Sequence, residues 1–245
     1  MTYALHAEWT KLRTLASTFW LLLAAAVRCP SGRCAEDPAK ISLTGIYLGQ
    51  VVVAVIAVMA VSGEYGTGMI SVTLVAIPRR VTVLAAKAAV LTGLILVAGT
   101  ISVLVSLLAG RLILPGHGIG PAHGYPALSL GDGPVLRAAF GSVLYLVLIA
   151  LLSLGAAAAV REAAAAIGVI LGLLFLFPII GAAVSNAGLA RHIQQIGPMT
   201  AGLAIQATTG LSSLPIGPWA GLGVLAAWAA GALLLGGLLL RLRDA

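Results

Sequence analysis

Residues 41–62 read ISLTGIYLGQVVVAVIAVMAVS, 22 consecutive positions without a charged side chain. A helix rises about 1.5 Å per residue and the hydrocarbon core of a bilayer is about 30 Å thick, so about 20 residues cross it. The strands of an outer-membrane barrel would alternate polar with apolar side chains, and this stretch does not alternate. It therefore predicts a transmembrane helix.

The composition of the whole chain is that of an integral membrane protein. Of its 245 residues, 60% are hydrophobic and 9% are charged, whereas an ordinary soluble domain has about 25% charged residues. This composition excludes nucleic acid binding, secretion and conventional soluble enzymes as first interpretations. We attribute the net charge of +7 to orientation in the bilayer and to contact with anionic head groups.

Four further uncharged stretches predict spans at residues 88–110, 138–160, 163–184 and 218–240. An earlier apolar stretch is uncharged for only 14 residues, and we interpret its residues 17–27 as a short first span. An interfacial or re-entrant segment, with five spans in total, is the alternative. We therefore expect an all-α, polytopic membrane protein with six transmembrane helices, forming a single transmembrane domain over residues 1–245.

The segment before the short span, residues 2–16, predicts an amphipathic helix that lies in the head-group plane. Leu5, Trp9 and Leu12 share one face at 100° per residue, and the cations Lys11 and Arg13 lie on the other. With both termini cytoplasmic, the six-span layout places eight of the 14 Lys and Arg residues on the cytoplasmic side and six outside. That division is a weak positive-inside signal.

Several kinds of chemistry are missing from the sequence. It has no phosphate-binding loop, no zinc-protease His pair and no nucleophile elbow. All seven acidic residues fall at span ends or in loops, which disfavours coupling to a proton gradient, although sodium held by backbone carbonyls stays open. We expect no cofactor and no metal, and we interpret His117, His123 and Asp132 as members of a solvated loop. Any energy for uphill transport would then come from another subunit.

Residues 63–87 form the most informative connection. An acidic residue closes the preceding span, a short helix-compatible segment follows, and a proline and a basic pair lead into the next span. This pattern predicts a short cytoplasmic helix that a soluble partner could hold, with a plain connecting loop as the alternative. The residues concerned are Glu64, Gly66, Thr67, Met69, Pro78, Arg79, Arg80 and Lys87.

The order of these residues resembles the cytoplasmic loop of permease subunits of bacterial type-2 ATP-binding-cassette (ABC) exporters. The beginning of the chain, AEWTKLR at residues 7–13 and STFW at residues 17–20, is similar to bacterial members, as is PMTAG at residues 198–202, which matches their last outer loop. The resemblance implies a multi-pass protein of the bacterial plasma membrane.

In that family two permease chains pair, identical or not, and each receives an ATPase subunit on its cytoplasmic face. The resemblance implies that the residues of the 63–87 loop form the coupling surface and that the helix around Trp9, Lys11 and Arg13 braces it. The chain would export an apolar or amphipathic compound with ATP that the partner hydrolyses, and would not itself be an enzyme. A non-transporting scaffold that recruits a soluble partner through the same loop is the alternative, and an intramembrane enzyme is disfavoured.

Overall fold

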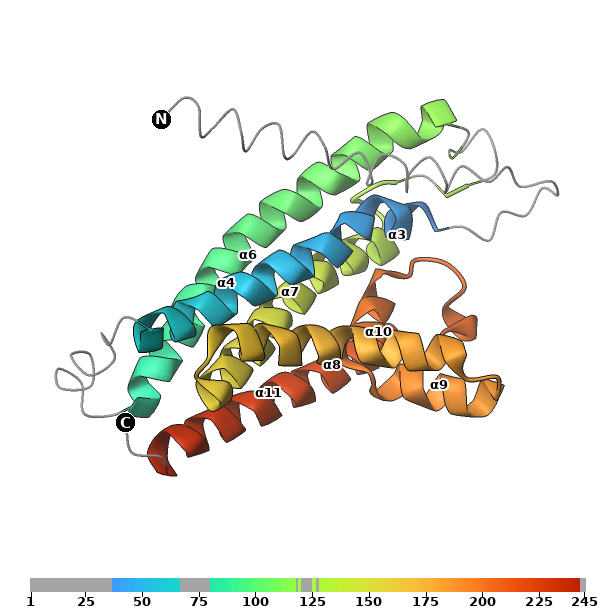
Figure 1. Cartoon of the computed structure of the whole chain (residues 1–245). Helices are drawn as coiled ribbons and strands as arrows, with labels where there is room; N and C mark the ends of the chain where they lie inside the picture. The colour runs from blue at the N-terminus through green and yellow to red at the C-terminus, as the bar shows by residue number, and fades with distance from the viewer. Residues whose placement is uncertain (1–36, 67–79, 118, 120–124, 127, 243–245) are drawn as a thin grey trace, which may run out of the picture.

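The computed structural model of the chain describes residues 37–66, 80–117, 119, 125–126 and 128–242 (Figure 1). Within these ranges all regular structure is helical and there is no strand, as the sequence predicts. Five segments are long and apolar enough to cross a membrane: Pro38–Ser62, Thr82–Gly116, Gly133–Val160, Ala163–Ala183 and Pro218–Leu240. The chain is therefore a helical, multi-pass membrane protein. The predicted short span at residues 17–27 and the interfacial helix at residues 2–16 lie outside the described residues.

The first described span is built from three consecutive helical pieces. They are α3 (Pro38–Ser42), the 3-10 turn η1 (Leu43–Gly45) and α4 (Ile46–Gly66). The second span, α6 (Arg80–Ile113), ends in the 3-10 turn η2 (Leu114–His117). Three more long helices follow, α7 (Gly133–Val160), α8 (Ala163–Ala183) and α11 (Pro218–Leu242).

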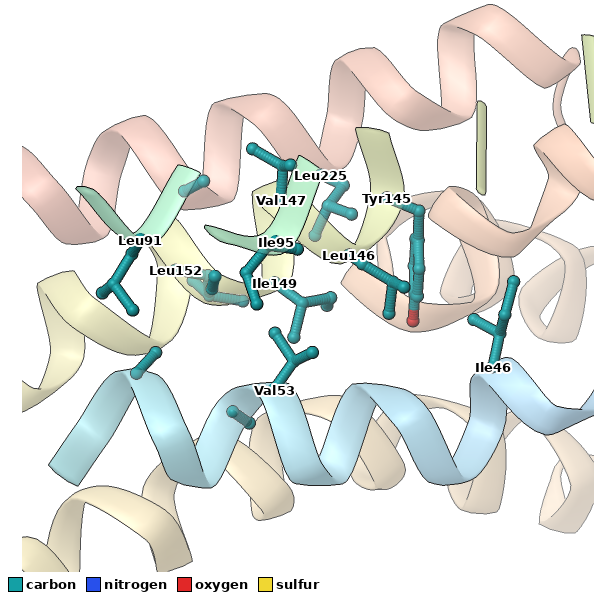
Figure 2. Packing of buried hydrophobic residues seen from close by; sticks show 14 of the residues in the cluster. Ile46, Val53, Leu91, Ile95, Tyr145, Leu146, Val147, Ile149, Leu152 and Leu225 are labelled. Carbon is teal, nitrogen blue, oxygen red and sulfur yellow. The ribbon is translucent and has the colours of Figure 1, made fainter. Parts of the chain in front are cut away.

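Helix α7 is the centre of the bundle. In its most apolar 18-residue stretch 67% of the residues are buried, whereas in the corresponding stretches of the other four spans 17–33% are. Figure 2 shows Val53 of α4, Ile95 of α6 and Leu225 of α11 around Ile149 and the neighbouring side chains of α7. The other helices therefore place most of their surface outward, and the large apolar side chains exposed along α6 are those expected to face lipid.

Helices α7 and α11 approach each other at two glycines. A Cβ added to Gly155 would lie 2.5 Å from the backbone of Ala232 and Leu233, and one added to Gly236 would lie 2.5 Å from the carbonyl oxygen of Gly155. Small residues allow such close approach of helix backbones in membranes. The pair is thus fixed by backbone contact as well as by side chains.

The segment between α8 and α11 differs most from the prediction, which treated it as an outer loop. Asn186 accepts hydrogen bonds from two backbone amides and begins α9 (Ala187–Ile196), which packs on α8. The chain then forms α10 (Pro198–Leu203) and the 3-10 turn η4 (Ala204–Gln206), both packed against α7 and α11. A further 3-10 turn, η5 (Leu211–Ser213), precedes α11. Residues 198–207 are mostly buried, so this segment is part of the bundle rather than a loop.

Candidate functional site

The two helices that flank the predicted coupling segment, α4 and α6, have their facing ends at one end of the bundle (Figure 1). Helix α4 continues to Gly66 and α6 begins at Arg80, so only residues 67–79 separate the two helices. Glu64 and Gly66 are therefore in the last turn of α4, and Lys87 lies two turns inside α6. The prediction of a connection spanning all of residues 63–87 was too long. The turn between α7 and α8 and the last turn of α11 lie at the same end.

Eight predicted site residues lie outside the described residues or at their edge. Thr67, Met69, Pro78 and Arg79, and with them Trp9, Lys11 and Arg13 of the amphipathic helix, lie outside the described residues. Arg80 is described only as the first residue of α6. What the structure does bring together is the pair of helix ends from which residues 67–79 leave and return.

Lys87 ties these two helices together. Its Nζ donates a hydrogen bond of 2.6 Å to the backbone oxygen of Ala60, and the side chain is half-buried. In a regular helix the same oxygen also accepts the amide of the residue four positions later, which here is Glu64. Lys87, the predicted docking cation, thus contacts α4 at the turn that leads to Glu64, the predicted docking acid. A movement of α4 would therefore displace the hydrogen-bond partner of α6.

The neighbouring turn joins α7 to α8 through two residues. Arg161 ends α7 in the left-handed region, with φ 66°, and its amide donates 2.8 Å to the oxygen of Ala157. Glu162 then caps α8 by accepting the amide of Ala164 at 2.9 Å. The guanidinium of Arg161 also reaches the oxygen of Leu239 in the last turns of α11, at 3.5 Å. A cation is favourable at the carboxyl end of a helix, so this contact ties three helices together at the end of the bundle where α4 ends and α6 begins.

A second polar cluster lies inside the bundle, in its opposite half. The hydroxyl of Tyr145 in α7 donates to Oε1 of Gln50 in α4, and Nε2 of Gln50 donates to the sulfur of Met199 in α10 at 3.5 Å. All three side chains are buried. Hydrogen bonds of this kind hold helices together where no water can replace the lost partner. Gln50 was not singled out by the sequence analysis because a single amide among 22 uncharged residues carries little signal.

Two more buried side chains in this half have no hydrogen-bond partner among the described residues. They are Ser142 in α7 and Gln206 in η4, each 0% exposed. Arg137, which the sequence analysis placed outside the span, is half-buried in α7 and donates 2.6 Å from Nη2 to the oxygen of Ala207. The interior next to η4 is therefore more polar than the uncharged stretches suggested.

Asp37 fastens the start of the first described span to the segment that follows η4. Its carboxylate accepts the amides of Ala39 and Lys40, which caps α3, and also the amides of Thr208 and Thr209 and the hydroxyl of Thr208. A carboxylate at this position is well suited to satisfy the free amides of a helix start. The acid was placed in a loop by the sequence analysis, without a role.

An apolar groove of about 600 Å³ runs between α7, α8 and α11. Leu152, Ile170, Trp228 and Leu235 are among its lining residues, with several alanines and one glycine. The indole of Trp228 packs edge-on against Phe177, with ring centroids 6.2 Å apart, and donates 3.0 Å to the oxygen of Ile196. Such a surface suits an alkyl chain or an apolar ring system.

No group of three or more His, Cys, Asp or Glu residues capable of holding a metal ion occurs in the part of the chain that the structure describes. No protein-family model matches the chain, and a comparison with curated proteins found no match. Its function must therefore be argued from the helix ends around residues 67–79, the buried polar cluster and the apolar groove.

Proposed function

We propose that the chain is the membrane-spanning permease subunit of an ATP-driven exporter of the bacterial cytoplasmic membrane, working with a second permease chain. It would move an apolar or amphipathic compound with ATP that a separate subunit hydrolyses. The proposal combines the resemblance of residues 63–87 to the coupling loops of type-2 ABC exporters with the arrangement of the helices next to them.

The observation that carries the proposal is the hydrogen bond between Lys87 and the oxygen of Ala60. It links α4 and α6 within two turns of the point where each meets residues 67–79. A soluble subunit that pushed on those residues would therefore move both helices as a pair. At the same end of the bundle, Arg161 links α7 to α11. The pair of α4 and α6 could then move relative to the pair of α7 and α11.

The apolar groove supports the substrate class. It is lined by apolar side chains from three helices. The five candidate spans of the described chain contain no Asp or Glu. A highly charged solute would find no carboxylate counter-ion there, whereas an apolar chain would lose nothing by entering. We therefore favour an apolar or amphipathic compound over a polar one.

The test begins with affinity purification of the tagged chain from native membranes in mild detergent, followed by identification of any ATPase bound to it. The complex is then reconstituted in liposomes, and ATP hydrolysis is measured for the native chain and for Glu64→Ala and Arg79→Ala. We expect each variant to lower the activity about fivefold, which corresponds to a coupling free energy of about 1 kcal/mol. Arg111→Ala is the matched control, because Arg111 is an exposed cation at the far end of α6.

Two results would contradict the proposal. One is that no ATPase is bound to the chain. The other is that the Glu64 and Arg79 variants hydrolyse ATP and assemble as the control does. If an ATPase binds but no candidate compound ever crosses the liposome membrane, the scaffold function described above replaces the exporter.

A further inference from the structure

A pocket of about 560 Å³ lies at the end of the bundle opposite the close of α4 at Gly66. One wall comes from α3 and the beginning of α4, and the other from residues 207–214. The two walls are held together by the three hydrogen bonds that Asp37, at the start of α3, accepts from Thr208 and Thr209. The pocket is therefore a fixed feature of the fold and not a gap between independent segments.

Three hydrogen-bond donors of the wall have no acceptor among the described residues. They are the ammonium of Lys40, the hydroxyl of Tyr47 and the hydroxyl of Thr209. The other hydroxyls of the wall are engaged locally: Thr44 donates 2.7 Å to the oxygen of Ile41, and Ser213 donates 2.7 Å to the oxygen of Gly210. Within the described ranges these three groups therefore lack acceptors, and a ligand that offers several acceptor oxygens would complement them.

The charges around the pocket favour an anion. The carboxylate of Asp37 is already the acceptor of five hydrogen bonds and so has little left to offer a cation. Lys40 has no ion-pair partner in the described part of the chain, and the guanidinium of Arg137 binds the oxygen of Ala207, a residue of the pocket wall. Lys40 and Arg137 thus supply two positive charges in or next to the wall, and Asp37, whose oxygens already accept hydrogen bonds, supplies the one negative charge.

The position of the pocket favours an amphipathic ligand. Ile41 and Leu214 line it beside the three free donors. Lys40 and Tyr47 belong to the first turns of a candidate membrane span, and Trp219, 55% exposed, lies at the start of α11 at the same end. Aromatic and basic side chains at the ends of spans mark the level of the lipid head groups. A ligand bound there can keep its apolar part in the bilayer.

We propose that this pocket binds the anionic head group of an amphipathic molecule, a phosphate ester or a carboxylate, with Lys40, Tyr47 and Thr209 as the donors. The site does not depend on the export function, because a resident phospholipid and an exported amphiphile would both present this chemistry.

The binding experiment uses the full-length chain in nanodiscs of neutral phosphatidylcholine. Dihexanoyl phosphatidylglycerol is titrated, and binding is followed by native mass spectrometry, with dihexanoyl phosphatidylcholine and inorganic phosphate as comparison ligands. We expect saturable binding of phosphatidylglycerol that weakens about tenfold in Lys40→Met and a few-fold in Tyr47→Phe, since charge-assisted hydrogen bonds are the stronger ones. Arg111→Met, which removes an exposed cation at the same end but outside the pocket, should bind as the native chain does.

Three results would overturn the proposal: equal binding of phosphatidylcholine, equal weakening by the Lys40 and Arg111 variants, or saturation by inorganic phosphate at the same concentration. Tyr47→Phe keeps the test informative if Lys40→Met does not fold. Mass spectrometry of the lipids that co-purify with the native chain and with Lys40→Met separates the two sources. An anionic lipid lost from the variant identifies a resident lipid, whereas binding of only the added ligand identifies a cargo site.

Discussion

Replacing Gly155 by alanine tests how closely α7 and α11 approach each other. The added Cβ would lie 2.5 Å from the carbonyl carbon of Ala232 and 2.5 Å from the amide nitrogen of Leu233, whereas ordinary contacts begin at 3.4 Å. Both neighbours are backbone atoms, so no side chain can rotate away. The two helices would have to separate by about 0.9 Å at this level, which loosens the contacts of a closely packed interface.

The expected cost follows from this geometry. Overpacking a well-packed core costs about 1–3 kcal/mol, and the change from glycine to alanine in a helix returns about 0.5–1 kcal/mol. The difference is a net loss of about 0–2.5 kcal/mol. We expect about 2 kcal/mol, near the top of that net range, because the contact involves backbone on both sides and recurs at Gly236. For a chain of this size, the loss lowers the melting temperature by about 4–8 °C.

The assay is thermal unfolding in detergent, followed by circular dichroism or by fluorescence-detected size exclusion. The control is Gly223→Ala on α11, where an added Cβ has nothing within 4 Å, so only the gain in helix propensity remains. The control should melt at or slightly above the native temperature. A melting temperature for Gly155→Ala equal to that of the control would show that the two backbones are not in contact there.

Three further changes test the polar contacts. Tyr145→Phe leaves the buried Oε1 of Gln50 without its donor and should lower the free energy of unfolding by about 1–3 kcal/mol. The double variant with Gln50→Leu should regain part of this loss in thermal unfolding, and additive losses would contradict the pairing. Asp37→Ala removes the cap of α3 and the link to the segment after η4, and should cost about 2 kcal/mol or more, with Asp37→Asn intermediate; a neutral result would refute the role of the carboxylate. Lys87→Met removes the hydrogen bond to Ala60 and should lower ATP hydrolysis by the complex about fivefold. The melting temperature should change by no more than about 3 °C. Unchanged hydrolysis with a larger fall in melting temperature would make the lysine purely structural.

The five long helices were predictable because an uncharged stretch of about 20 or more residues matches the thickness of the hydrocarbon core when it forms a helix. Their ends were not. The predicted spans at residues 88–110 and 138–160 were bounded by Lys87, Arg111 and Arg137. Helix α6 contains the first two of these residues, and α7 contains the third. Long basic side chains can reach the head groups or a carbonyl from inside a helix, so a charge marks the edge of the hydrocarbon and not the end of the helix.

Gly-x-x-x-Gly spacings occur at residues 45 and 49, 168 and 172, and 217 and 221, and such spacings permit close helix packing without demonstrating it. Added Cβ atoms at Gly45, Gly49, Gly168, Gly172 and Gly217 would have nothing within 4 Å. Gly221, the partner of Gly217, does lie against the backbone oxygen of Ala201 in α10. The close approaches between α7 and α11, at Gly155 and Gly236, lie outside such pairs, because packing depends on which face a helix turns to its neighbour. That choice is made by tertiary structure, which spacing alone does not encode.

The segment that packs into the bundle after α8 was missed for a related reason. Asn186 before α9, the apolar positions Leu189, Ile193 and Ile196, and Pro198 at the start of α10 are recognisable helix signals. Nothing in the residues themselves says that α10 is buried. Its burial depends on Gly202 lying against Tyr145 and on Gly221 lying against the oxygen of Ala201, contacts between residues far apart in sequence.

The buried position of α10 and η4 has a consequence for any route across the membrane. Their side chains pack against α7 and α11 in the half of the bundle that lies away from the close of α4. Under the export function proposed above, a molecule crossing by way of this chain would pass along its outer surface, against lipid or against a second chain, and not between its helices. The width of such a path would then be set by the distance between two chains.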